Sequence, residues 1–101
     1  MPVIQRSLFD ATVQSRFEAF HLRHPEVLTQ LLGMARDLQR RGHARIGIGM
    51  LFEVLRWQHM TASDPSEPYR LNNDYRSRYV RLICEVDPEL GALFETRELR
   101  A

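Results

Sequence analysis

Apolar residues recur at spacings of three and four along most of this chain, and prolines and glycines interrupt the pattern. Side chains with that spacing share one face of an α-helix. The pattern predicts helices over about 7–23, 25–41, 47–60 and 72–86, and a short fifth helix that begins at 87–89. We therefore expect an all-α fold, built as a compact bundle of four to five helices.

Short polar residues, proline and glycine mark the expected ends of these helices. Ser7 or Asp10 can cap the first helix, and Asp87-Pro88-Glu89 repeats the cap-and-proline signal at the start of the fifth. Pro25 separates the first helix from the second, because proline is tolerated in a first helical turn but not inside a helix. Gly42 is a natural stop for the second helix. Residues 1–6 are expected to form a flexible N-terminus.

The segment 47–60 is apolar almost all round. Only Glu53 and Arg56 supply a narrow polar strip, and their spacing predicts an ion pair on the helix surface. A helix that is apolar on most sides is usually buried on several of them, so we expect this one at the centre of the fold. Trp57 would be an aromatic anchor for a protein partner if it were only partly covered.

The length of 101 residues predicts a single domain over 1–101, large enough to bury a core without disulfides or a metal. A hydrophobic fraction of 44% and a charged fraction of 27% are those of ordinary globular proteins. The lone cysteine, Cys84, cannot form an intramolecular disulfide and is expected to pack as a small hydrophobic side chain. Since no apolar run reaches about 18 residues and no charged leader is visible, we expect a cytoplasmic location and no membrane partner.

Arginine supplies all 14 basic residues, and these are unevenly spread although the net charge is only +1. A GC-rich genome is a simpler explanation for the absence of lysine than selection for bidentate hydrogen bonding. A secondary basic patch over 36–45, accompanied only by Asp37, consists of Arg36, Arg40, Arg41 and Arg45. Acids outnumber arginines over 85–101, so we expect a domain that is basic in its middle and acidic at its end.

The segment 69–83 joins an asparagine-rich turn to an amphipathic helix that carries several arginines. At about 100° per residue, one face of this helix gathers apolar side chains, namely Tyr75, Tyr79, Leu82, Ile83 and Val86. The opposite face gathers polar ones, namely Ser77, Arg78, Arg81 and Glu85. We expect the tyrosines to anchor the helix and the arginines to project from it.

Arginine forks suit phosphates, guanine edges and carboxylates, so this segment predicts binding to an anionic partner. The expected nucleic-acid-binding residues are Arg70, Asn72, Asn73, Arg76, Ser77, Arg78 and Arg81. Asn72 and Asn73 have an alternative role as caps and turn formers. Arg78 and Arg81 have an alternative role as a solvated face, which Glu85 would partly neutralise from one turn further on.

The helices over 25–41 and 47–60 are joined by a connection as short as that of a helix-turn-helix. A recognition helix needs polar side chains, however, and the helix over 47–60 is nearly all apolar. The helix over 72–86 is therefore the better candidate for a recognition helix that contacts DNA bases. The expected arrangement is helix-turn-helix-like, with 61–71 as a short wing or a loose loop.

No constellation of catalytic or metal-binding residues is visible in the sequence. His21, His24, His43 and His59 lack the ligand spacing of a metal site. The glycines on either side of Ile48 lack the rest of a phosphate-binding fingerprint. We therefore expect no enzyme, no cofactor and no bound metal.

Several short motifs together resemble a family of small, uncharacterised proteins of bacteriophages and prophages. The resemblance spans 17–100, and its most recognisable mark is Leu71-Asn72-Asn73 followed by Tyr75. The other motifs are Phe17-Glu18-Ala19-Phe20-His21, His24-Pro25, the run 47–57, Arg78-Tyr79, Arg81-Leu82, and Phe94-Glu95 with Arg97. The resemblance implies a phage or mobile-element context and carries no established activity.

The leading functional prediction is a DNA-binding accessory or regulatory protein that contacts double-stranded DNA through Arg76, Arg78 and Arg81. The alternative is a protein-interaction module that binds a host or phage protein, or assembles with itself as a homodimer, without binding nucleic acid. Tyrosine and arginine serve both kinds of interface, so the sequence leaves this choice open.

Overall fold

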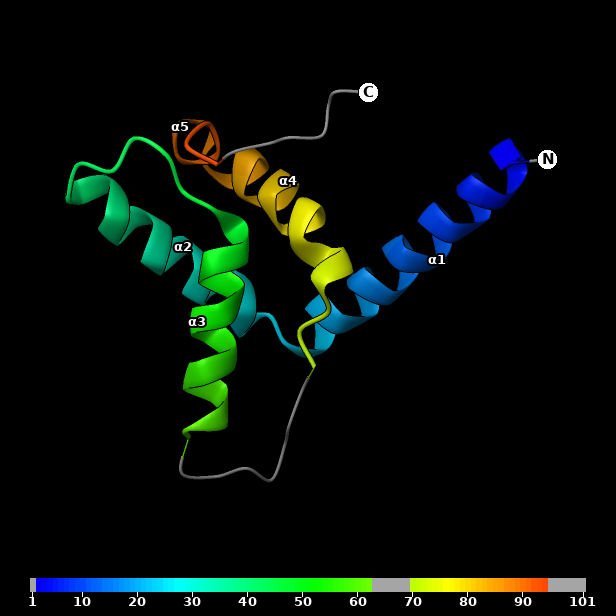
Figure 1. The fold of residues 1–101 in the computed structure, drawn as a ribbon, viewed down its shortest axis with the longest axis horizontal. Helices are drawn as coiled ribbons and strands as arrows, with labels where there is room; N and C mark the ends of the chain where they lie inside the picture. The colour runs from blue at the N-terminus through cyan, green and yellow to red at the C-terminus, as the bar shows by residue number, and fades with distance from the viewer. Residues whose placement is uncertain (1, 63–69, 95–101) are drawn as a thin grey trace.

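The computed structural model describes residues 2–62 and 70–94 of the chain (Figure 1). These residues form five α-helices and one short 3-10 helix: α1 (Pro2–Arg23), α2 (Glu26–Arg40), α3 (Ile48–Met60), η1 (Asn73–Tyr75), α4 (Arg76–Val86) and α5 (Pro88–Gly91). Within the described residues there is no β-strand, only an isolated parallel bridge between Ile46 and Phe94. The expected all-α fold is confirmed.

The first helix begins earlier than the sequence predicted. α1 starts at Pro2, so Ser7 and Asp10 lie inside the helix and the prediction that one of them caps it was wrong. A proline is well tolerated at a first helical position, because its missing N–H would have no partner there. The flexibility expected for residues 1–6 stays a prediction.

The end of α2 follows the expected glycine stop. Gly42 has a φ of 94°, in the left-handed region that glycine adopts without strain. Its N–H donates to the carbonyl of Gln39 at 3.0 Å, and the N–H of His43 donates to the carbonyl of Leu38 at 3.1 Å. These two bonds form a Schellman motif, which satisfies carbonyls at the helix end and turns the chain toward α3.

The core is arranged around α4, which contacts α2, α3 and α5. Tyr79 of α4 is fully buried, and Phe17 of α1 meets its ring edge-on at a centroid distance of 4.9 Å. Phe52 of α3 approaches the same ring at 6.1 Å. The prediction that the tyrosines anchor this helix is therefore confirmed. The other fully buried large side chains are Leu31, Ile46, Leu51, Leu55, Ile83, Leu90 and Val27.

α3 is buried on one side, where Leu51, Phe52 and Leu55 face the core. On its other side, Met50, Trp57 and Met60 are exposed. The prediction that the helix over 47–60 is central and covered on several sides was therefore wrong. On α4, Cys84 and Val86 are exposed, which also corrects their expected places beside the core and on its apolar face.

A side-chain cap begins α5, and a backbone hydrogen bond ties the segment after it to the rest of the molecule. The side chain of Asp87 accepts a hydrogen bond from the N–H of Leu90 at 3.2 Å, which confirms the expected cap. The N–H of Ile46, just before α3, donates to the carbonyl of Leu93 at 2.9 Å. The end of the described chain is thereby tied to the α2–α3 connection.

The N-terminal half of α1 extends away from the other helices (Figure 1). Val13 and Phe17 are buried, whereas Phe9, one turn before Val13 on the same face, is 60% exposed. The apolar stripe of α1 is thus longer than the part of the core that it covers.

Candidate functional site

The seven residues expected to bind nucleic acid divide into side chains held by the fold and side chains that are free to meet a partner. Arg78 belongs to the first group. Its Nε donates to Oε1 of Gln14 on α1 at 3.1 Å, and its Nη1 donates to the carbonyl of Asp74 at 3.3 Å. Arg78 therefore joins α4 to α1, a structural role that a phosphate contact would have to interrupt.

Arg76 is also held against the protein. Its guanidinium lies beside Gly49 at the start of α3, so close that a Cβ added to Gly49 would be 3.5 Å from Cζ of Arg76. The Arg76 side chain is only partly exposed. This position covers the first turn of α3 and leaves only part of the guanidinium accessible.

The two asparagines serve the local backbone. The side-chain oxygen of Asn72 accepts a hydrogen bond from the N–H of Asp74 at 2.8 Å and so caps η1. The side-chain oxygen of Asn73 accepts a hydrogen bond from Nη2 of Arg56 on α3. The role of cap and turn former, weighed against DNA contact for these residues, is confirmed for Asn72.

Arg56 connects α3 to the chain that leads into α4. Its Nη1 pairs with Oε2 of Glu53 at 2.8 Å, which confirms the expected i,i+3 ion pair. Its Nη2 donates to the carbonyl of Leu71 at 2.6 Å as well as to Asn73. A single guanidinium thus neutralises the acid on its own helix and fixes the Leu71–Asn73 backbone.

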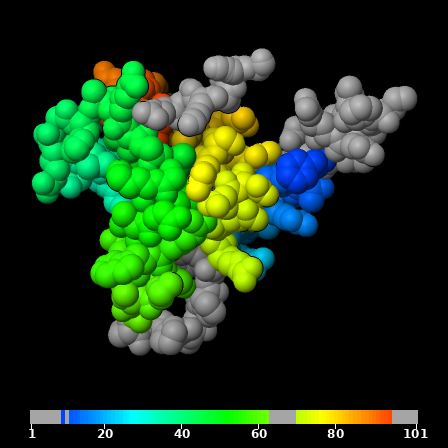
Figure 2. Space-filling view, viewed as in Figure 1, coloured from blue at the N-terminus to red at the C-terminus, as the bar shows by residue number. Residues whose placement is uncertain are grey.

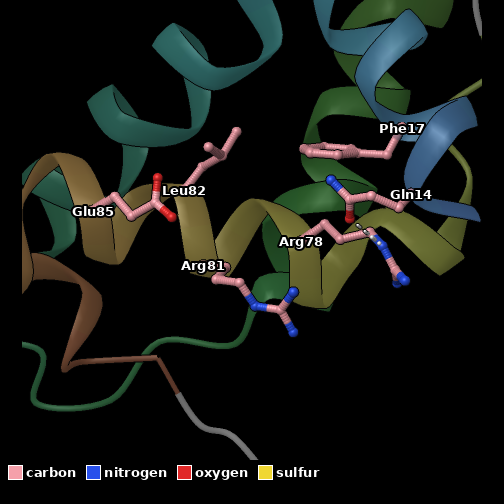
Figure 3. Close-up of a pocket in the computed structure, with 6 residues that line it drawn as sticks. All are labelled: Gln14, Phe17, Arg78, Arg81, Leu82 and Glu85. Atoms are coloured by element: carbon pink, nitrogen blue, oxygen red, sulfur yellow. Dashed lines mark hydrogen bonds between the residues drawn. The ribbon is translucent and has the colours of Figure 1, made fainter. Parts of the chain in front are cut away.

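The second group, whose side chains are exposed and can meet a partner, consists of Arg70, Ser77 and Arg81. Arg81 lines a small cleft between α1 and α4, of about 80 Å³, together with Gln14, Phe17, Arg78, Leu82 and Glu85 (Figure 3). That volume is far below the roughly 300–1,000 Å³ of small-molecule sites. Arg81 also shares the outward face of α4 with Glu85, so that face carries both signs of charge.

The secondary basic patch is largely engaged with carboxylates. Arg40 and Arg41 approach the two oxygens of Asp37 at 3.4 and 3.0 Å. Arg36 lies 3.7 Å from Asp87 at the start of α5. Arg45 is exposed after the turn that ends α2. Three of the four arginines therefore share two acids, which lowers the positive charge that the patch offers to DNA.

A different surface stands out on α3, on the side opposite its buried residues. Met50 is 52% exposed, Val54 37%, Trp57 65% and Met60 78%. Spacings of four, three and three place neighbouring members of this set beside one another on the helix. We call these four side chains the α3 face. In the space-filling view, α3 forms a large part of the visible side of the molecule (Figure 2).

The α3 face is comparable in area to the largest apolar patch of a typical monomeric protein. Taking about 150–250 Å² for a fully exposed large side chain, its four members present apolar area on the order of 400–500 Å². Leu51, Phe52 and Leu55 on the inner side of the same helix are almost completely buried. The helix therefore presents one apolar face to the core and a second to solvent.

Sequence reasoning missed three members of the α3 face, because it placed the whole apolar circumference of this helix in the core. Trp57 alone was considered as an anchor for a partner. The available signal was the all-round apolar character of 47–60 in a chain of only 101 residues. So short a chain has few helices with which to cover every side of one of them.

In the described part of the chain we looked for a metal site and for a membrane-spanning helix. Across 2–62 and 70–94, no three His, Cys, Asp or Glu side chains come together as a group that could hold a metal ion. In the same residues, no helix combines the length and the apolar content needed to cross a membrane. The wing expected over 61–71 lies mostly outside the described residues, as does the acidic end of the chain after Phe94.

Comparison with known proteins adds no relative from which a role could be transferred. No protein-family model, no curated protein sequence and no solved structure matches this chain. A role for this chain therefore has to be inferred from the geometry of its own side chains.

Proposed function

We propose that this chain is a protein-interaction module and that the α3 face is its binding surface. The exposure of Met50, Val54, Trp57 and Met60 on one helix carries the proposal. Tryptophan is among the residues that dominate binding energy at interfaces. Methionine is frequent on surfaces that bind other proteins, because its flexible thioether adapts to the partner. The largest exposed apolar patch of a protein is often a functional surface.

Two arginines of α4 favour protein binding over DNA binding, because they are already in contact with other parts of this chain. Arg78 bonds to Gln14 and to the Asp74 carbonyl, and Arg76 lies against Gly49. A DNA-binding surface needs arginines that reach phosphates or base edges without giving up such contacts. If the chain belongs to the phage context that its motifs resemble, the partner is a phage or host protein, or another copy.

The proposal is tested by site-specific photocrosslinking. The photoreactive residue p-benzoylphenylalanine is placed at Trp57, and the protein is irradiated in cells of the organism that carries it. The control carries the same residue at Leu22, a side chain of α1 that is 82% exposed. We expect a discrete adduct from position 57 that is absent from position 22 and is lost when Met50→Glu is added. Equal adduct patterns at both positions would rule out the α3 face as the binding surface.

DNA binding is the second candidate, because Ser77 and Arg81 lie exposed one turn apart on α4. Anisotropy of a labelled mixed-sequence duplex separates the two candidates. The protein-interaction proposal expects no saturable binding at about 50 mM salt. Binding that weakens steeply between about 50 and 200 mM salt, and that Arg81→Ala reduces, would favour DNA as the partner.

A further inference from the structure

The α3 face is also the surface through which this chain can pair with itself. We propose that a second copy of this chain binds there, through antiparallel pairing of two α3 helices. This inference rests on the proposed function, since it uses the same surface. Three observations carry it: the charge of the face, the order of its side chains, and its area.

The charge of the α3 face suits pairing with itself. A two-fold axis brings each group near its own copy, so an uncompensated charge close to the axis would repel its mate. Glu53 is the ionisable side chain on this side of α3, and Arg56 of the same helix neutralises it at 2.8 Å. The formal net charge of the whole chain is only +1, so long-range repulsion between copies is small.

When two copies of α3 run antiparallel, the side chains of one copy meet suitable partners on the other. With the two-fold axis between Glu53 and Val54, Met50 lies opposite Trp57 of the second copy, and the reverse contact is identical. The same register sets Val54 opposite Glu53, whose carboxylate keeps its pair with Arg56 of its own helix. Contact between a methionine sulfur and an aromatic ring is favourable. The same register places Met60, the most exposed member of the face, opposite Gly47.

Gly47 leaves room for that contact. It lies just before α3, and a Cβ added to it would meet no atom within 4 Å. A long side chain from the second copy therefore finds open space at this end of the helix. Helices pack closely, with their axes about 8–10 Å apart, when a large side chain on one helix lies opposite a small one on the other.

The area sets the expected strength of the dimer. About 400–500 Å² from each copy gives roughly 800–1,000 Å² in total, slightly below the usual range for stable interfaces. The stem of Glu53 near the axis and that of Gln58 at the edge add to it. An interface of this size fits a weak, reversible dimer; area alone does not fix its affinity, and we take a Kd on the order of 10–100 μM as the working value.

Sedimentation equilibrium of the full chain, from about 1 to 300 μM, tests the association, with the concentration range chosen around the expected Kd. A reducing agent is present because Cys84 is exposed and could form intermolecular disulfides. We expect a monomer at the lowest concentration and a mass approaching two chains at the highest. Trp57→Glu should weaken the dimer at least tenfold, whereas Leu22→Glu, an equal change on another exposed apolar side chain, should leave it unchanged.

Crosslinking tests the antiparallel register in a Cys84→Ala background with a short bismaleimide. In the proposed register, two copies of Val54→Cys lie within about 2 Å of each other along the helix axis, and two copies of Met60→Cys lie roughly 20 Å apart. We expect Val54→Cys to crosslink to itself and Met60→Cys not to do so. A mixture of Met60→Cys and Gly47→Cys should crosslink. Self-crosslinking of Met60→Cys would indicate parallel pairing and overturn the register.

The outcomes separate this inference from the proposed function. A protein that stays monomeric at about 300 μM, or a dimer that is indifferent to Trp57→Glu, overturns pairing through α3. If position 57 nevertheless forms an adduct with a different protein in cells, the proposed function stands and its partner is another chain. If neither a dimer nor an adduct specific to position 57 forms, both fail.

Discussion

Gly91 lies where α5 packs against α4, and the backbone there leaves no room for a side chain. A Cβ at this position would be 2.5 Å from Sγ and 2.7 Å from Cα of Cys84. The Cα belongs to the backbone of α4 and cannot rotate away, so the two helices would have to separate. We expect Gly91→Ala to lower the free energy of unfolding by about 1–3 kcal/mol, as measured by urea denaturation.

Gly33 provides the matched control for that substitution. It lies inside α2, and a Cβ added to it would meet no atom within 4 Å. Because alanine favours helix more than glycine does, Gly33→Ala should raise the free energy of unfolding by about 0.5–1 kcal/mol. Equal effects of the two substitutions would contradict the close contact between α5 and α4.

Arg56 is the side chain whose hydrogen bonds hold the start of the η1–α4 segment to α3. Arg56→Ala would leave the carbonyl of Leu71 without this donor in a partly buried position. We expect a loss of about 1–3 kcal/mol in the free energy of unfolding, from chemical denaturation. Glu53→Ala removes only the exposed partner of the same arginine and should cost less than about 1 kcal/mol. An equal loss from both would assign the effect to the surface ion pair.

Among the elements, η1 and α4 depend on the asparagine that precedes them. The Asn72 side chain accepts the N–H of Asp74, a donor at the helix start that the backbone leaves without a partner. Asn72→Ala should therefore lower the free energy of unfolding by about 0.5–2 kcal/mol, whereas Asn72→Asp, which keeps the accepting oxygen, should preserve most of it. Thermal melts followed by circular dichroism measure both. Loss of stability in the aspartate variant as well would argue against capping.

In the molecule as a whole, α1 is attached to the other helices chiefly by aromatic contacts. Phe17 meets Tyr79 and lies 5.7 Å from the ring of Tyr75, and Phe20 lies 5.4 Å from the same ring. Phe17→Ala should cost about 3–5 kcal/mol in the free energy of unfolding, because it removes a buried ring and leaves a cavity. Truncation of an exposed side chain on the same helix, Leu22→Ala, should cost less than about 0.5 kcal/mol.

Hydrogen exchange shows which helices lose stability when the Phe17 ring is removed. In Phe17→Ala, we expect the amides of α1 to lose protection more than those of α2 and α4, since the lost contacts join α1 to the remaining helices. Equal loss throughout would mean that α1 and the other helices unfold as one cooperative unit.

Local chemistry in the sequence was enough to predict most helix ends. The left-handed glycine after α2, the cap at Asp87 and the pair of Glu53 with Arg56 all involve residues within a few positions of one another. Such interactions form wherever the helix forms, so spacing alone identifies them. The start of α1 was misplaced because two residues with good capping chemistry lie within a segment that continues as helix.

By itself, then, the sequence determined that this chain is helical, where most of its helices lie, and that the tyrosines of 72–86 face inward. Only the tertiary structure decided which apolar faces are covered. It buried the inner side of α3 against α4, left Met50, Val54, Trp57 and Met60 exposed, and engaged Arg76 and Arg78 with other elements. The physical reason is that helix formation depends on neighbours along the chain, whereas burial depends on whether a distant segment lies opposite.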